Sequence, residues 1–312
     1  MVDNCQIQCW YPQFKKITFK VKIIELPSEF RNYLEEDGVF MPQNYYVEDD
    51  QDSNSDEESI ESEDKTPKYD FSALEEEIKA TVDEYDEKVF IKLNWSAPRD
   101  ANWLVPNLHC ESTQEIYSLL KSSVFISHDV SAAYQGCVDH EGNSAPEKLY
   151  LALKKYHHNV RTHRENEFRC FVKENTLICV TQRDTQVYYP SLETQLEQFK
   201  PLILDFFNDH LQGHFADPSF VFDIYIDIPP NNKVWLVDFN PWHSKTDPGL
   251  LDWSEVMAHP TSDPVEWRII TEETGVRANE MSQYKVPAEI VEAPNSDEVK
   301  QFFDDMRGAT SE

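Results

Sequence analysis

Apolar and polar residues alternate in several stretches of the chain, which is the pattern of half-buried strands. In the segment Lys16–Ile23, the apolar residues Ile17, Phe19, Val21 and Ile23 alternate with lysines and a threonine. This alternation predicts a strand there. Two further pairs of such stretches, each joined by a short turn, predict β-hairpins over residues 167–183 and 220–240.

Other segments have apolar residues spaced three and four apart, which predicts helices. The longest of them covers Leu192–Leu211. Ser72 with Glu75, and Ser112 with Glu115, are capping-box signals for two more helices. Helices and hairpins in one chain, without an internal repeat, predict the α+β class.

The hairpin over 220–240 carries two aspartates. If Ile228 pairs with Lys233 across the turn, Asp223 lies directly opposite Asp238, and Asn240 shares their face. Two carboxylates about 5 Å apart repel by roughly 3 kcal/mol at an effective dielectric of 20. Either a proton is shared or a cation is bound there. Two carboxylates and an amide oxygen are suitable ligands for Mg²⁺ carrying phosphates; the alternative is two acids that point to water at a different register.

The hairpin over 167–183 has one apolar face and one face with cations. With a two-residue turn, Arg169 and Lys173 share a face with Glu167, and Gln182 lies opposite Glu167. Such a face predicts a floor for an anionic ligand. The alternative is a surface hairpin held by ion pairs.

An apolar strand ends at Lys92, which begins the segment KLNWSAPRDA (92–101). A strand lysine can reach a phosphate as a point charge, and Arg99 can make a bidentate contact. Trp95 either packs on a base or fills the core. The segment lacks the Lys-x-Asp-Gly pattern of covalent nucleotidyltransferases, so an adenylated lysine is not expected.

The chain is strongly acidic, with a formal charge of −30. Nucleic acid and anionic membranes are not expected as partners, because both are bound through excess Lys and Arg, whereas a partner with a basic surface is favoured. Ten of the acids lie in residues 48–64, which contain no base, so the remainder carries −30 + 10 = −20. This composition predicts a disordered loop. Within it, Ser53 and Ser55 each precede an acid by three residues, a pattern that suits an acidophilic kinase; the alternative is a solvated spacer.

The six cysteines form no Cys-x-x-Cys pair, and the chain shows no secretory signal and no long apolar run. These features predict a protein of the reducing cytosol without a zinc site.

Several blocks of the sequence resemble one family. The blocks KLNWSAPRDA (92–101), EFRCFVKEN (167–175), TQRD (181–184), FVFDIYID (220–227) and VWLVDFNPW (234–242) are similar to the cell division cycle protein 123 family, also called D123. The early CWYPQF (9–14) and the acidic loop match its pattern as well. The resemblance implies an ATP-grasp-like fold, in which two lobes with antiparallel sheets and flanking helices form a nucleotide cleft. We expect an N-terminal lobe over 1–150, a C-terminal lobe over 151–290 and a tail over 291–312.

The resemblance also implies a function and a site. The family binds magnesium-ATP and acts as an assembly chaperone that contacts the gamma subunit of eukaryotic translation initiation factor 2, so that the alpha and beta subunits can join; this supports translation initiation and cell cycle progression. A monomer is expected outside that complex. Asp223, Asp238 and Asn240 become magnesium ligands and ATP contacts. The other implied ATP contacts are Lys92, Asn94, Trp95, Ala97, Arg99, Asp100, Tyr150, Leu151, Ala152, Leu153, Arg169, Lys173, Gln182 and Arg183, with the base against residues 150–153.

Two features depart from the wider ATP-grasp pattern. Residues 131–145 contain only Gly136 and Gly142, so no glycine-rich flap is available, and the metal motif is Asp-x-Asn in place of Glu-x-Asn. Both disfavour fast phosphoryl transfer and leave nucleotide binding intact. Three functions stay open: an ATP-binding assembly factor without evident ligase activity, an ATP-dependent carboxylate–amine ligase, and a nucleotide-independent acidic adaptor.

Partner contacts have three candidates in the sequence. They are an exposed pair of aromatic residues at Trp10 and Tyr11, the strand at Lys16–Ile23, and Phe302-Phe303; the alternative is that these residues pack in the core or in the tail.

Overall fold

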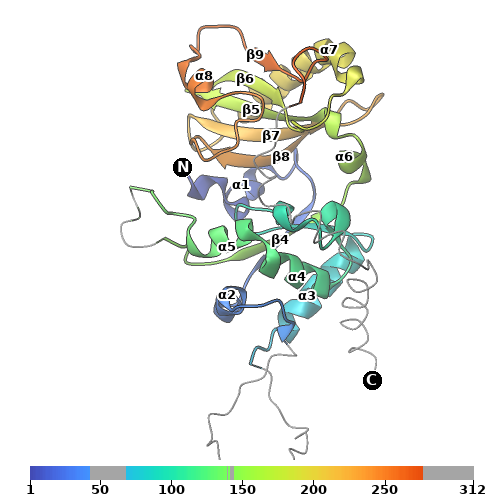
Figure 1. Cartoon of the computed structure of the whole chain (residues 1–312), viewed down its shortest axis with the longest axis vertical. Coiled ribbons are helices and arrows are strands. Elements are labelled where there is room, and N and C mark those ends of the chain that lie inside the picture. The colour runs from blue at the N-terminus through green and yellow to red at the C-terminus, as the bar shows by residue number, and fades with distance from the viewer. Residues whose placement is uncertain (43–67, 139, 141–143, 277–312) are drawn as a thin grey trace, which may run out of the picture. The chain divides into compact units, whose positions relative to one another are not determined.

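The computed structural model describes residues 1–42, 68–138, 140 and 144–276 (Figure 1). The predicted acidic loop over 48–64, Ser53 and Ser55 within it, the tail over 291–312 and Phe302-Phe303 lie outside these residues. The described chain divides into two units that interleave in sequence. Unit 1 contains residues 1–23, 92–95 and 154–276, and unit 2 contains the described parts of 24–91 and 96–153. This division differs from a boundary at residue 150, because residues 1–23 fall in unit 1.

Unit 1 is built on a five-stranded sheet with the order β8-β7-β5-β6-β9. Its strands are β5 (Glu167–Lys173), β6 (Thr176–Gln182), β7 (Phe220–Ile226), β8 (Val234–Pro241) and β9 (Glu266–Arg268). Its helices are η1 (Asp3–Cys5), α1 (Ile7–Phe14), α6 (His158–Thr162), η5 (Arg164–Asn166), α7 (Pro190–Phe206), the π-helical turn η6 (Phe207–Leu211) and α8 (Trp253–Ala258). Neighbouring strands are antiparallel except β6 and β9, which run parallel. Both predicted hairpins and the predicted long helix are confirmed.

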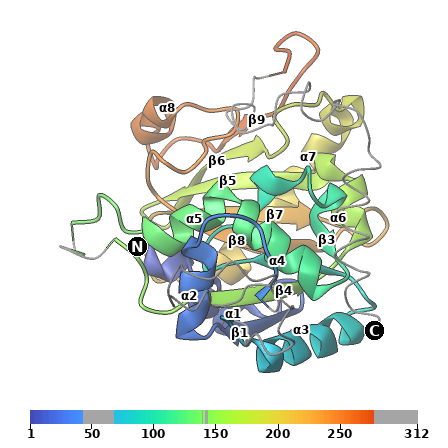
Figure 2. The ribbon, with the colours of Figure 1, turned by 60° about the horizontal axis from the view of Figure 1, so that its bottom comes forward.

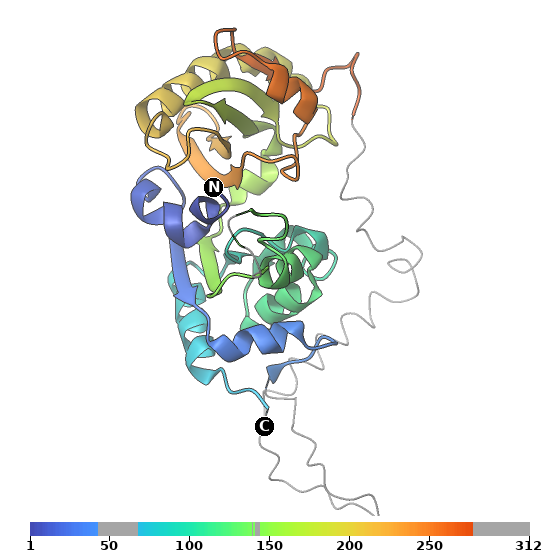
Figure 3. The same cartoon turned by 90° about the vertical axis from the view of Figure 1, so that its left-hand side faces the viewer.

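Different elements pack on the two faces of this sheet. On one face, the ring of Phe168 packs against Phe199 of α7, with ring centroids 5.9 Å apart. On the opposite face, Phe171 and Val221 pack with Leu251 and Val256. Leu251 and Val256 belong to the segment that follows β8 and includes α8, drawn in orange in Figure 3. Because residues two apart on a strand share a face, Arg169 and Asp223 lie on the same face as this second cluster. The polar face of unit 1 is therefore the one that α7 does not cover.

Helix α1 covers the edge strand β8. The rings of Trp10 and Phe14 pack on Phe239, with centroids 5.4 and 5.2 Å away. Trp10 is only 2% exposed, so the expectation of an exposed Trp10 is wrong. The reason is that Ile7, Trp10 and Phe14 form one buried apolar stripe on a helix, from which Trp10 and Phe14 pack against the sheet.

The strand predicted at Lys16–Ile23 is displaced toward the C-terminus. The chain turns at residues 15–17, and the strand β1 is Val21–Glu25. Before that strand, the Leu236 N–H of β8 donates to the carbonyl of Ile17 at 2.8 Å, and Thr18 bridges to Leu236. The alternation of apolar and polar residues over 17–21 therefore reflects contact with the edge of β8 as well as strand pairing.

Unit 2 holds most of a four-stranded sheet with the order β1-β4-β2-β3. The strands that follow β1 are β2 (Val89–Lys92), β3 (His109–Cys110) and β4 (Tyr150–Lys155), and the chain passes between the units within β1, β2 and β4. The helices are α2 (Ser28–Glu35), α3 (Ser72–Glu84), η3 (Arg99–Ala101), η4 (Pro106–Leu108), α4 (Thr113–Ser122) and α5 (Val124–Ser131). Helix α4 contacts α2, α3 and α5 (Figure 2). With the sheets of both units, this mixture confirms the α+β class.

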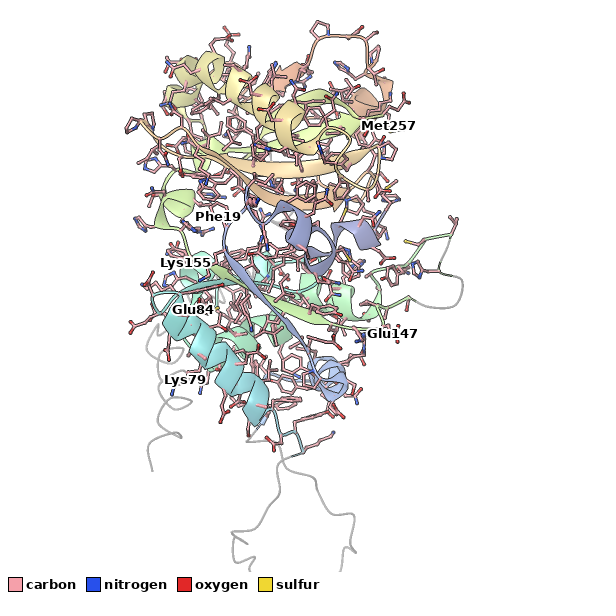
Figure 4. The ribbon with its side chains drawn as sticks, turned by 180° about the vertical axis from the view of Figure 1, so that it is seen from behind. Phe19, Lys79, Glu84, Glu147, Lys155 and Met257 are labelled. Carbon is pink, nitrogen blue, oxygen red and sulfur yellow. The ribbon has the colours of Figure 1, made fainter. Side chains whose placement is uncertain are left out.

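The two predicted capping boxes have different outcomes. Ser112 precedes α4, and its Oγ accepts a hydrogen bond from the Glu115 N–H, as expected. The box at Ser72 is wrong, because Asp70 Oδ1 accepts from the Ser72 N–H at 3.0 Å and the Ser72 Oγ–H at 2.6 Å. The carboxylate of Asp70 replaces the predicted cap as the local acceptor. Lys79 and Glu84 lie on the exposed side of the same helix (Figure 4).

Across the described residues, none of the helices has both the length and the apolar character needed to cross a membrane.

Candidate functional site

Asp223 and Asp238 face each other across β7 and β8, as the sequence predicts. The two residues are register partners, and the Asn240 Nδ2 lies 3.5 Å from Asp223 Oδ2. Asp223 is 5% exposed, so its charge lies in a poorly solvated position. The three oxygen-bearing side chains named from the sequence are therefore brought together on one face of the unit 1 sheet.

A β-bulge at Val237 produces this pairing. Near the turn, the Asp227 N–H donates to the Lys233 carbonyl, which is one residue away from the predicted Ile228–Lys233 pair. Ile224 then pairs with Leu236, and the register shifts before Asp223 pairs with Asp238. Without the shift, Asp238 would lie on the opposite face of the sheet, because a one-residue slip exchanges the faces.

The protein itself supplies cations for both carboxylates. Lys92 Nζ contacts Asp238 Oδ1, and its side chain is 2% exposed. Arg169 binds Asp223 through two parallel hydrogen bonds, Nε to Oδ1 at 2.8 Å and Nη2 to Oδ2 at 2.7 Å. Burial alone would lower the pKa of Arg169, but the contact with Asp223 outweighs it and raises that pKa above the ordinary value. Each of the opposed acids is thus paired with a side-chain cation of the same unit.

Lys154 is a third cation of this group, and the sequence analysis missed it. Its buried ammonium donates to the carbonyl of Val237, the bulged residue, at 2.9 Å and lies 5.9 Å from the Trp10 ring centroid. Burial lowers its pKa to about 8, with Asp238 opposing that shift and Lys92 adding to it. The signal was present in the sequence, since Lys154 ends the buried run Leu151–Leu153, where a lysine needs a specific reason.

Arg183 and Asp247 complete the polar group. Arg183 Nη1 donates to Asp247 Oδ2 at 2.9 Å, whereas Arg183 Nε lies 3.7 Å from Asp223 Oδ2, which is beyond hydrogen-bond distance. Asp247 also accepts a bond from Arg169 Nη1 through its main-chain carbonyl, at 2.6 Å. Asp247 follows β8 in a loop, and nothing in the local pattern identified it as part of a site.

The oxygen donors of this group fit a divalent cation that arrives with phosphates. In the described part of the chain, Asp238 Oδ2 and Asn240 Oδ1 have no hydrogen-bond partner, and carboxylate oxygens such as those of Asp223 can accept more than one contact. No cluster of three or more His, Cys, Asp and Glu side chains suited to a metal occurs among the same residues. One or two carboxylates with an amide are typical of Mg²⁺ that keeps its remaining positions for water and phosphate oxygens.

A family model described as D123 matches residues 10–294 of the chain. The chain belongs to the D123 family. A protein named cell division cycle protein 123 from Candida glabrata is 39% identical over 316 residues, which cover 94% of this chain and 87% of that protein. The solved structure of Cdc123 from Schizosaccharomyces pombe matches with a TM-score of 0.72 and 33% identity, over 87% of this chain and 97% of that one.

Other D123 relatives are longer than this chain. A protein named translation initiation factor eIF2 assembly protein from Aspergillus oryzae is 39% identical over 262 residues, which cover 81% of this chain and 62% of the relative. The matched region thus spans less than two thirds of the length of that protein.

Four residues that the D123 resemblance implicates have other partners within unit 1. Lys173 donates to the carbonyls of Met257 (labelled in Figure 4) and His259, at 2.9 and 3.1 Å, and so caps the end of α8. The Asn94 side chain donates to Gln6 Oε1 at 2.7 Å. The Trp95 indole N–H donates to the carbonyl of Val2 at 2.9 Å, so Asn94 and Trp95 both fasten the N-terminal segment.

Gln182 is the fourth, and its position differs from the predicted one. A bulge after Phe171 shifts the register of β5 and β6, so Gln182 pairs with Phe168 and not with Glu167. The side chain is fully buried and bonds to main-chain groups of Asp184, Val187 and Ile270.

The remaining implicated residues lie in unit 2. Asp100 caps α5, because its carboxylate accepts from the Ser123 hydroxyl and the Val124 N–H, both at 2.6 Å. The Tyr150 hydroxyl donates to Glu25 at 3.2 Å, whereas the side chains of Leu151, Ala152 and Leu153 are fully buried. Arg99 lies in η3, and Ala97 precedes it in the connecting segment.

Proposed function

We propose that unit 1 binds magnesium-ATP on the face that carries Asp223 and Asp238. The observation that carries this proposal is the local charge. Four cations (Lys92, Lys154, Arg169 and Arg183) gather around Asp223 and Asp238 in a chain of charge −30. Lysine and arginine side chains gathered in one poorly solvated place suit the phosphate groups of a nucleotide, which accept charge-assisted hydrogen bonds.

The side chains have separate roles in this proposal. Lys92, Lys154 and Arg183 bind phosphate oxygens, whereas Arg169 is held by three hydrogen bonds to Asp223 and Asp247 and keeps Asp223 in place. Asp238 and Asn240, with Asp223, would hold Mg²⁺, which when bound neutralises charge on the phosphates. The ATP-grasp-like arrangement, the base contacts at 150–153 and the roles of Arg99, Asn94, Trp95 and Gln182 remain part of the family expectation. No turnover is assigned.

The biological role that we propose is assembly of translation initiation factor eIF2 in the cytoplasm. The relatives named eIF2 assembly protein and cell division cycle protein 123 support it, through the family membership of the chain. At the finer level, we propose that the gamma subunit of the factor is the direct partner. The acidic character of the chain favours a basic surface on that subunit.

Calorimetric titration with ATP and Mg²⁺ tests the nucleotide proposal. The unmodified protein should bind, and Arg183→Met should lose at least about tenfold in affinity, because a hydrogen bond to a charged group contributes about 1.5–3 kcal/mol. Arg268→Met is the matched control, since Arg268 is also an ion-paired arginine of unit 1 but lies on β9, paired with Glu255 and Glu266. Absence of binding by the unmodified protein at millimolar nucleotide would leave only the adaptor function.

A reconstitution experiment tests the assembly proposal independently. Purified gamma subunit should bind the protein, and subsequent addition of alpha and beta subunits should give the three-subunit factor faster than without it. Retention of nucleotide binding with no effect on subunit joining would reject the assembly role alone. Steady ADP release with a small carboxylate and an amine would instead favour the ligase.

A further inference from the structure

The loop between β8 and α8 brings a third acid to the polar face of unit 1. Asp247 lies in this loop, and each of its three acceptor atoms has a defined partner. The main-chain carbonyl accepts from Arg169 Nη1, Oδ2 accepts from Arg183 Nη1, and Oδ1 accepts from the Gly249 N–H at 2.9 Å. The carboxylate is therefore oriented by its own loop before it contacts Arg183.

The rest of the loop is fastened to the sheet. The Leu250 N–H donates to Thr181 Oγ1 of β6 at 3.2 Å. The Thr246 hydroxyl donates to the Pro241 carbonyl at 2.7 Å, and the Trp253 indole N–H donates to the Thr246 carbonyl at 2.6 Å. Hydrogen bonds on both sides of Asp247 tie the loop to the sheet and to its own backbone.

Arg183 has an incomplete set of partners on its other edge. Its side chain is only 10% exposed, yet its buried Nε has no hydrogen-bond acceptor among the described residues, because Asp223 Oδ2, at 3.7 Å, is within ion-pair distance only. A buried donor without an acceptor is uncommon in a native fold and calls for a missing ligand or water. Because Nη1 is held by Asp247, the donors left for such a ligand are Nε and Nη2, the edge that suits a phosphate oxygen pair.

We infer that Asp247 is a positioning residue for Arg183. It holds Nη1 from its hydrogen-bonded loop, so that the Nε–Nη2 edge faces the phosphates of the bound nucleotide. This inference rests on the proposed nucleotide function. The half-exposed Asp247 carboxylate also repels a phosphate, but solvent screens that repulsion, whereas a free arginine must give up its rotamer freedom each time it binds. Orientation therefore outweighs repulsion.

The test compares Asp247→Asn with Glu266→Gln. Asparagine keeps the acceptor for the Gly249 N–H and removes the charged acceptor for Arg183. Glu266 is the matched control, because it is also a half-exposed acid bound to an arginine, Arg268, in the same unit. We expect Asp247→Asn to weaken magnesium-ATP affinity about tenfold, and Glu266→Gln to change it less than twofold. In an Arg183→Met background, Asp247→Asn should cause no further weakening.

A second measurement monitors the Arg183 side chain in the absence of nucleotide. In ¹⁵N-labelled protein, the Arg183 Nε–H signal should be resolved in the unmodified chain and should broaden, or exchange faster with water, in Asp247→Asn. An unchanged Arg183 signal, or ATP affinity equal to or above that of the unmodified protein, would overturn the inference. If the unmodified protein binds no ATP, the proposed function fails, and the arginine signal still decides the role of Asp247. Asp247→Ser, which keeps a short acceptor for Gly249, replaces the asparagine variant if that variant does not fold.

Discussion

Opposed acids at the candidate site are stabilised by cations from distant parts of the sequence. Lys92 binds Asp238, and Arg169 binds Asp223. In each pair, the two residues are more than fifty positions apart in the sequence. A carboxylate pair at about 5 Å would otherwise repel by roughly 3 kcal/mol. Each acid is thus tolerated only with its own cation, which makes the pairs interdependent.

The Lys92–Asp238 pair gives the first prediction. Lys92→Met should lower the free energy of unfolding by about 3 kcal/mol, because it leaves a carboxylate without its buried cation. Asp238→Asn in the same chain should recover much of that loss, since it removes the unpaired charge. Urea unfolding of the two single variants and the double variant measures the coupling. Additive effects of the two substitutions would contradict the pairing.

Lys154 gives a prediction for pH. Its folded-state pKa is about 8, against an ordinary 10.5. Only the ammonium form attracts phosphate, so magnesium-ATP affinity should be full below pH 8 and should fall as the pH rises, by about tenfold at pH 9. The effect on folding has the opposite sign, because between pH 8 and 10.5 the unfolded chain holds more protons and stability increases. Titration calorimetry between pH 7 and 9.5 tests this.

Lys154→Met is the control for that profile. The variant should bind ATP more weakly at pH 7, and its ATP affinity should show no fall centred near pH 8. A fall of the same size in both proteins would assign the titration to another group.

At the residue scale, the sequence predicts the parts of the site that lie on regular strands. Asp223, Asp238, Asn240, Lys92 and Arg169 are found by counting along hairpins or to the end of an apolar run. Asp247 could not be found in this way, because its position depends on a loop that folds back over β6. Lys154 could be recognised as a lysine beside a buried strand, but its partner is a carbonyl that only the bulge makes available.

At the element scale, the bulges decide which side chains share a face. The predicted pairing of the two aspartates is right although the predicted turn is one residue off, because the bulge at Val237 restores the register. In the other hairpin, the bulge after Phe171 moves Thr181 opposite Arg169 and makes the predicted pairing of Gln182 wrong. A bulge carries no distinct sequence signal here, so the two hairpins are predictable while their register is not.

The loop that holds Asp247 gives the third prediction. Gly249 has a φ of +66°, and a Cβ there would lie 2.8 Å from Thr181 Cγ2. Gly249→Ala should therefore lower the free energy of unfolding by about 2–3 kcal/mol, from the backbone conformation and the clash together. Thr181→Ser removes Cγ2 and keeps the hydroxyl that accepts from Leu250.

In the Thr181→Ser background, the alanine substitution should cost only about 1 kcal/mol, the part due to the backbone. Thermal unfolding of the four proteins separates the two contributions. An equal cost in both backgrounds would show that the methyl contact is not the obstacle.

At the scale of the whole molecule, the units interleave because the N-terminal segment closes the edge of the unit 1 sheet. Residues 17 and 18 pair with Leu236, and Trp10 packs on Phe239. Hydrophobic pattern alone cannot assign such a segment to a unit, since the pattern gives the buried side and not the surface that covers it. The net charge of −30 acts at the same scale, because its field extends beyond any single contact.

The acidic segment 48–64 tests what that charge does. Its removal takes the charge from −30 to −20 without touching a described contact of the polar face. If the segment steers a basic partner, the deletion should slow association with the gamma subunit severalfold at low salt, leave dissociation unchanged and reduce the salt dependence of the association rate. Magnesium-ATP affinity should stay within twofold, because phosphate binding depends on Lys92, Lys154 and Arg183. Stopped-flow association at several ionic strengths measures the effect on the partner, and calorimetry on the same samples measures the ATP affinity. A faster dissociation of the partner would instead indicate that the segment contacts it directly.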